Sequence, residues 1–142
     1  SGGMKNIVVR NNTFQGTDAG LRFKSAVKRG GKSENIYIDH IYMTDITGDA
    51  ITFETTYFDN HVGAKQQAAP IKQEFLPDFQ DIHISNVYVR GCKNGIVAHG
   101  AEGMIHDITI KDCNIFYNKN AKDIDAACKI TLENVNFSTF AK

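Results

Sequence analysis

The 142-residue sequence has no excess charge of either sign, only two prolines and three cysteines, and no long apolar run. Its 16 basic and 16 acidic residues cancel, so the chain lacks the positive field that attracts a phosphate backbone or an anionic lipid surface. A transmembrane helix needs about 20 apolar residues in succession, and no signal-peptide pattern is present. We therefore expect neither a nucleic-acid partner nor a membrane partner.

The three cysteines are too few and too irregularly placed to form a disulfide framework or a zinc site. Cys92, Cys113 and Cys128 are odd in number and lack the spacing of metal ligands, which argues against both a disulfide scaffold and a zinc site. Buried free thiols are the expected state, and no metal or cofactor is expected. The cysteines leave the redox compartment undecided.

Paired carboxylates, the mark of glycoside hydrolysis, are not evident. The eleven aspartates include no Asp-Asp dipeptide. Asp39, Asp112 and Asp123 are expected at bends, where turn formation explains them. His99, within Ala98-His99-Gly100, is expected on an outward strand position as a surface histidine, because no orienting carboxylate can be assigned to it.

A repeat of five segments runs along the chain, at residues 6–14, 35–43, 81–89, 107–115 and 129–137. Counted from the first isoleucine, apolar residues recur at offsets of zero, two, five and seven, and Asn12 alone breaks the rule. A period of two that is interrupted once indicates strand, bend, strand. The expected bend residues are types that favour tight turns, namely Asn11, His40, Asn86, Asp112 and Asn134.

Shorter strands are expected at 21–24, 51–54 and 96–99, each preceded by a small residue. No helical period intervenes, so a βαβ fold is excluded. We predict an all-β parallel β-helix of about five coils, with residues 1–142 as a single partial domain and asparagine ladders between coils. A β-sandwich is the alternative, but it needs hairpin signals, and no Asn-Gly or Asp-Gly dipeptide joins adjacent strands.

A long insertion is expected at residues 55–80. It contains both prolines and a polar tract, and a loop of this length in a compact repeat is usually functional or disordered. Because it leaves the coil that follows residues 21–24, we expect it to form a wall of a cleft there.

The strand at 21–24 is the candidate binding element. Alternation along a strand turns Leu21 and Phe23 one way and Arg22 and Lys24 the other. Two adjacent cations repel each other unless an anion lies between them, so this face is a candidate binding surface for a carboxylate or phosphate. A solvated surface pair is the alternative. Glu54 is expected beside Lys24, either as its structural partner or to hold the ammonium ready for a ligand.

The repeat and the Arg-x-Lys strand together resemble glycoside hydrolase family 28, the polygalacturonase-like pectin hydrolases. The matching stretches are residues 1–7, 11–14, 16–25, 35–37, 51–57, 81–87 and 130–135. The resemblance implies a right-handed parallel β-helix whose groove binds a galacturonate-containing chain, and a secreted or periplasmic location. It also implies that Arg22 and Lys24 hold a sugar carboxylate and that Tyr57 lines the same subsite.

The family's catalytic residues are not matched. An Asn-Thr-Asp motif, an Asp-Asp pair and a Gly-His-Gly histidine precede the Arg-x-Lys strand in the family, where the acids perform inverting hydrolysis. Ala98-His99-Gly100 follows that strand instead. The resemblance therefore implies that the chain is a C-terminal portion, truncated or split, that lacks the N-terminal coils. We expect it to be inactive alone.

Two other functions stay open. One is a non-catalytic β-helix module that binds acidic polysaccharide. The other is a structural element that associates with itself, because an open end of a β-helix exposes unpaired backbone groups. The expected partners are thus an acidic, galacturonate-containing polysaccharide and either the missing N-terminal coils or a second copy of the chain.

Overall fold

The computed structural model describes residues 5–26, 32–56 and 78–139. Every regular element in these ranges is a β-strand, and none of the described residues forms a helix long and apolar enough to cross a membrane. The strands are β1 (Lys5–Gln15), β2 (Leu21–Ala26), β3 (Lys32–Thr44), β4 (Asp49–Thr56), β5 (Asp78–Phe79), β6 (Ile82–His99), β7 (Ile108–Ile124) and β8 (Ile130–Thr139).

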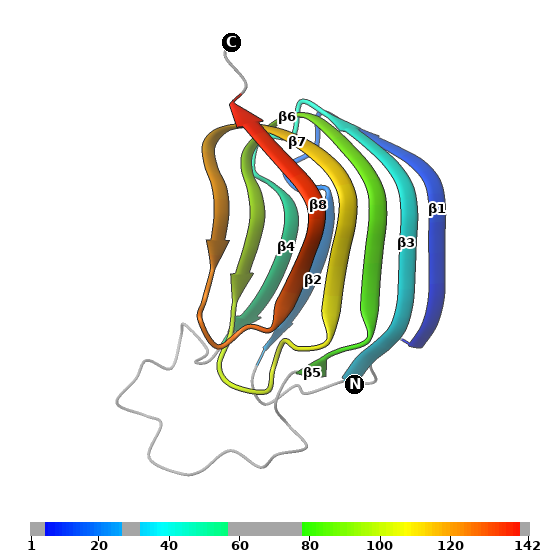
Figure 1. Cartoon of the computed structure of the whole chain (residues 1–142), viewed down its shortest axis with the longest axis vertical. Helices are drawn as coiled ribbons and strands as arrows, with labels where there is room; N and C mark the ends of the chain where they lie inside the picture. The colour runs from blue at the N-terminus through cyan, green and yellow to red at the C-terminus, as the bar shows by residue number, and fades with distance from the viewer. Residues whose placement is uncertain (1–4, 27–31, 57–77, 140–142) are drawn as a thin grey trace.

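The strands stack coil upon coil, and every named pair of them is parallel (Figure 1). The first wall contains residues 7–10, 36–39, 82–85, 108–111 and 130–133. The second wall contains 12–15, 41–44, 87–90, 113–116 and 135–138, and the third contains 21–24, 51–54, 96–99 and 122–124. This confirms the parallel β-helix. The β-sandwich alternative is wrong, because its antiparallel pairs are absent from the described strands.

A residue in the left-handed backbone region separates the first wall from the second in each coil. The five predicted bend residues have φ between 53° and 57°, a region that Asn, Asp and His enter more readily than other side chains. Asn134 Nδ2 donates to Asp112 Oδ1 at 2.8 Å, which links neighbouring bends. The predicted bends are therefore confirmed, and one hydrogen bond of the kind predicted for a ladder joins two of them.

The short strands predicted for the third wall are confirmed as β2, β4 and the second half of β6. A small residue precedes each of these strands because neighbouring atoms in the coil leave no room for a larger side chain. A Cβ on Gly20 would lie 2.3 Å from Met43 Sδ, and a Cβ on Gly95 would lie 2.4 Å from the Ala121 oxygen. The end of β7 adds a further segment to this wall, which the sequence pattern did not predict.

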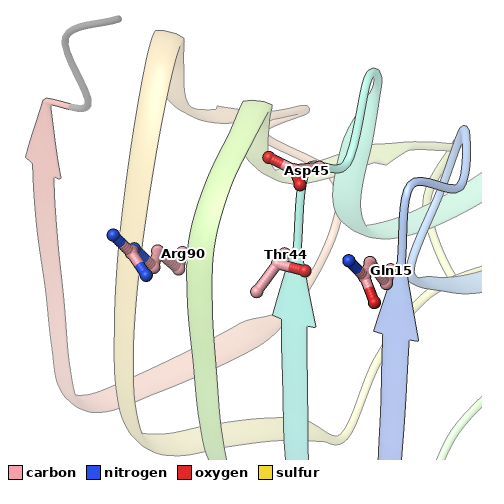
Figure 2. Close-up of a pocket in the computed structure, with 4 residues that line it drawn as sticks. All are labelled: Gln15, Thr44, Asp45 and Arg90. Atoms are coloured by element: carbon pink, nitrogen blue, oxygen red, sulfur yellow. The ribbon is translucent and has the colours of Figure 1, made fainter.

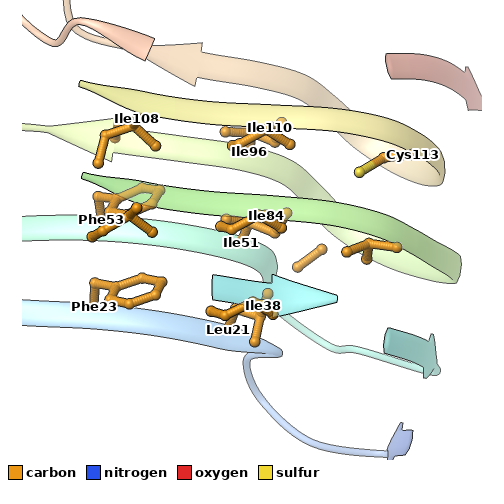
Figure 3. Packing of buried hydrophobic residues seen from close by; sticks show 14 of the residues in the cluster. Leu21, Phe23, Ile38, Ile51, Phe53, Ile84, Ile96, Ile108, Ile110 and Cys113 are labelled. Carbon is orange, nitrogen blue, oxygen red and sulfur yellow. The ribbon is translucent and has the colours of Figure 1, made fainter. Parts of the chain in front are cut away.

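Aliphatic side chains from the first and third walls fill one core between them (Figure 3). Burying a Leu or Ile side chain contributes about 1.5–3 kcal/mol, so these ladders dominate the stability of the coils. The first and third walls are therefore opposite sides of one interior. Among the labelled members, those that are at most 7% exposed include Ile38, Ile84 and Ile110 from the first wall and Leu21, Ile51 and Ile96 from the third.

The described residues reach into both ends of the predicted insertion. Thr55 and Thr56 belong to β4, and β5 pairs with the start of β3. Residues 57–77, which include Tyr57, lie outside the described ranges.

Candidate functional site

Arg22 and Lys24 extend from the outer face of β2. Both are exposed, whereas Leu21 is 7% and Phe23 5% exposed. Figure 3 shows these two apolar side chains directed into the core. The cations therefore share one side of the strand, as the alternation along a β-strand requires.

Stacked phenylalanines hold β2 from within. The rings of Phe23 and Phe53 lie 4.7 Å apart with an interplanar angle of 7°. Phe79 meets both rings edge-on, at 6.2 Å and 6.3 Å. Each aromatic pair contributes about 0.5–1.5 kcal/mol beyond its buried area. The buried side of the strand that carries the two cations is thus packed against three aromatic rings.

Rows of outward side chains cross the third wall from β2 to β7. Glu54 is half-buried next to Lys24, but no ion pair joins these two described residues. The Lys24 ammonium therefore lies next to the Glu54 carboxylate but makes no ion pair with it. In register order, the rows are Arg22–Thr52–Val97–Asp123 and Lys24–Glu54–His99.

At the far side of this wall, His99 lies between two carboxylates. Its Nε2 is 3.4 Å from Asp123 Oδ2, and its Nδ1 is 3.2 Å from Asp125 Oδ1. Asp125 Oδ2 also accepts a hydrogen bond from the Gly100 backbone N–H at 3.1 Å. The structure thus supplies the carboxylates that the sequence could not assign, and the His99 side chain is 43% exposed, as expected of a surface histidine.

The assignment of Asp123 to a bend is also wrong, because Asp123 lies in β7 opposite Val97. The repeat spacing contained this information. Ile82 and Ile108 are 26 residues apart and pair in register, and Asp123 follows Val97 by the same 26 residues. The same spacing, extended from the first strand of each coil to the third wall, places Asp123 opposite Val97.

On the opposite side of the core, Asp39 is the centre of a hydrogen-bond network in the first wall. Its Oδ1 accepts from Ser85 Oγ and from Asn86 Nδ2, both at 2.9 Å. Its Oδ2 lies 2.7 Å from His40 Nδ1 and 3.7 Å from Arg10 Nη2. The hydrogen bond from Asn86 is the largest influence that lowers the pKa of Asp39, from 3.8 to about 2. The carboxylate is therefore ionised at neutral pH, and both oxygens already have partners.

Two adjoining hollows lie on the first wall, with volumes of about 440 Å³ and about 290 Å³. Both are lined by Tyr37, His83, Ser85 and Lys111. The shared lining makes them one continuous depression across β3, β6 and β7.

A separate hollow of about 350 Å³ lies at the carboxyl end of the second wall (Figure 2). Its lining consists of Gln15 and Thr44 at the ends of β1 and β3, Asp45 just after β3, and Arg90 of β6. None of these three hollows contains Arg22 or Lys24.

The cysteines are free and buried, as predicted. Burial raises the pKa of Cys92 to about 12 and that of Cys113 to about 11, so neither supplies a thiolate nucleophile near neutral pH. Among the described residues, no group of three or more His, Cys, Asp or Glu side chains could hold a metal ion.

Comparison with known proteins agrees with the fold. The model of Glycosyl hydrolases family 28 matches residues 2–138, which is nearly the whole chain and includes the Arg-x-Lys strand. No curated protein matches the chain. Because the family match covers the stacked parallel coils from end to end, the chain belongs to glycosyl hydrolase family 28.

Proposed function

We propose that the chain is the C-terminal part of a polygalacturonase-like hydrolase and that Arg22 and Lys24 bind a sugar carboxylate of galacturonate-containing pectin. One observation carries this proposal: the two cations are exposed on the same side of a strand whose other side is buried. Family membership supports the class of ligand.

The two cations suit a carboxylate in different ways. The planar guanidinium of Arg22 can donate two parallel hydrogen bonds to the two oxygens, whereas the Lys24 ammonium acts as a compact point charge. Hydrogen bonds to charged groups contribute about 1.5–3 kcal/mol each. Tyr57 is proposed as a further contact in the same subsite.

The proposed role is substrate binding rather than proton transfer. The 142 residues contain neither an Asn-Thr-Asp sequence nor an Asp-Asp pair. The family's paired acids, which would protonate the leaving oxygen and activate the attacking water, are therefore not matched in this sequence. We expect no release of reducing sugar from polygalacturonate by the chain alone, and clear turnover would overturn this part of the proposal.

Calorimetric titration with oligogalacturonate tests whether Arg22 and Lys24 bind a sugar carboxylate. We expect measurable affinity that falls with added salt, because exposed charges are screened. Arg22→Ala and Lys24→Ala should each weaken binding by about tenfold or more. Lys119→Ala, which removes an exposed lysine of β7 outside both rows, serves as a charge-matched control. Binding that survives both test substitutions would reject the proposal.

A second candidate function is association through the β1 side of the helix. Ile7 and Val9 of β1 are only half-buried, whereas their register partners in β3, Ile36 and Ile38, are 2% and 3% exposed. We propose that N-terminal coils of the same enzyme, or a second copy of the chain, cover this edge. Sedimentation velocity over a range of concentrations tests it, and a stable monomer at high concentration would contradict association between copies.

A further inference from the structure

We infer that the third wall favours a saccharide of uneven charge, in which a galacturonate binds over β2 and a sugar without a free carboxylate lies over β7. This inference rests on the proposed role of Arg22 and Lys24, and it adds the composition of the saccharide that they bind. The observation behind it is a separation of charge along the wall, with cations at one side and carboxylates at the other.

The charge changes sign along the two outward rows of the third wall. β2 contributes two cations, Arg22 and Lys24, whereas Glu54 of β4 and Asp123 of β7 contribute carboxylates. Asp125, just after β7, adds a third carboxylate. Among the described residues of this wall, the carboxylates of the rows therefore all lie on the β4 to β7 side of the two cations.

The carboxylates at β7 are only partly neutralised by their neighbours. His99 lies between them, with Nε2 3.4 Å from Asp123 Oδ2 and Nδ1 3.2 Å from Asp125 Oδ1. A protonated imidazole cancels one of the two negative charges, so the group is negative near neutral pH in either state of His99. The neighbouring Lys122 does not change this balance, because its ammonium lies over the Phe137 ring of the second wall, 5.7 Å from the centroid.

These carboxylates face solvent beside strand ends that hydrogen bonds hold together. The side chains of Asp123 and Asp125 are 59% and 47% exposed. Asp125 Oδ2 accepts a hydrogen bond from the Gly100 backbone N–H at 3.1 Å. Thr55 Oγ1 donates to the His99 carbonyl oxygen at 2.9 Å, which joins the end of β4 to the end of β6. The negative group is therefore accessible to a ligand on the outer surface of the wall.

The spacing of the strands determines which sugar lies next to which charge. Neighbouring strands are about 4.8 Å apart, close to the length of one sugar ring, so a saccharide that runs across the wall places one sugar over each strand. β2, β4, β6 and β7 follow one another in this wall (Figure 1). A sugar over β7 is therefore three positions, or about 14 Å, from the sugar over β2. A free carboxylate there is repelled by the negative group, whereas a hydroxyl can donate a hydrogen bond to it.

Calorimetric titration of the full chain with hexasaccharides, at one low salt concentration, tests the inference. In a ligand where galacturonate and a neutral hexose alternate, each galacturonate has a neutral sugar three positions away. We expect this ligand to bind about threefold or more tightly than hexagalacturonate, and we expect added salt to reduce the difference. Partly methyl-esterified hexagalacturonate is the second uncharged source. A gain for either ligand supports the inference, and the comparison of the two identifies the uncharged sugar.

Single substitutions assign the effect to the carboxylates. Asp123→Asn should raise the affinity for hexagalacturonate by about threefold, because it removes one exposed negative charge. It should leave the affinity for digalacturonate unchanged, since a disaccharide over β2 and β4 does not reach β7. The charge-matched control is Glu133→Gln, which removes an exposed carboxylate of the first wall and should change neither affinity. Asp125→Asn should act as Asp123→Asn does, and if it fails to fold, Asp123→Asn still decides the outcome.

Digalacturonate separates the failure of this inference from that of the proposed function. If digalacturonate does not bind, the proposed role of Arg22 and Lys24 is rejected, and this inference is rejected with it. If digalacturonate binds but Asp123→Asn leaves the affinity for hexagalacturonate unchanged, only this inference is overturned. Equal affinity of the unsubstituted chain for hexagalacturonate and for both uncharged ligands would overturn it as well.

Discussion

Phe23 and Phe53 stack almost face to face inside the helix, with ring centroids 4.7 Å apart and planes 7° apart, beneath the strand that carries Arg22 and Lys24. Along β2 the exposed cations alternate with the buried side chains of Leu21 and Phe23, and Phe53 lies on the neighbouring strand β4. The position of the candidate binding face therefore depends on the packing of this aromatic pair.

Phe53→Ala should lower the free energy of unfolding by about 3–5 kcal/mol, because it removes a ring that is 0% exposed and leaves a cavity. Urea denaturation measures the loss. The matched control is Tyr88→Ala, which removes a ring that is 40% exposed and should cost less than about 1.5 kcal/mol. Equal losses for the two variants would show that the internal stack does not anchor the coil.

Arg22→Lys should weaken binding of oligogalacturonate even though the charge is kept, because the ammonium cannot donate two parallel hydrogen bonds to one carboxylate. The converse change, Lys24→Arg, should keep most of the affinity. Calorimetry of both variants at one salt concentration gives the comparison. If the two substitutions change the affinity equally, the affinity for oligogalacturonate depends only on the total charge of this face.

Asp39 should make stability depend on acid pH. Its pKa is lowered from 3.8 to about 2 in the folded chain, chiefly by the hydrogen bond from Asn86, so the unfolded chain binds more protons between these values. The stabilisation is present above about pH 4 and is lost as the pH falls through about 2. Unfolding measured from about pH 5 downward should show a shallower loss in Asp39→Asn than in the unsubstituted chain. If stability falls with pH to the same extent in both chains, the stabilising role assigned to the Asp39 carboxylate is contradicted.

Cys92 and Cys113 should resist thiol reagents in the folded chain near pH 8, because burial raises the pKa of the two thiols to about 12 and about 11. Mass spectrometry after brief alkylation tests this, and the chain unfolded in guanidinium, in which all three cysteines should react, is the control. Rapid native labelling of either residue would show that the core opens at these positions.

Much of the fold could be predicted because the repeat joins two local patterns. Apolar residues alternate within each strand, and a residue such as Asn86 or Asp112, which tolerates positive φ, stands where the alternation is interrupted. Asn12, the one exception to the apolar rule, is exposed on β1 and donates to the Arg10 oxygen at 3.1 Å. A polar residue is thus accommodated at this position of β1.

Other features could not be read from local patterns. Asn6, Asn35, Asp81 and Asp107 also have positive φ, between 52° and 57°, at the start of their coils. They precede the apolar pattern, so no interruption marks them. The carboxylates around His99 come from the next coil, and the stacked Tyr37–His83 pair joins residues 46 apart in sequence. Such neighbours become visible only when the coils are aligned in register.

The alternation along β2, β3 and β6 separates two evolutionary constraints. Side chains inside the coils determine whether the chain folds, whereas those outside determine what it contacts, and the two sets share no positions. Exchange of single exterior residues can therefore change ligand preference while the interior stays intact. Diversification of recognition among related solenoids should be concentrated at these alternate positions.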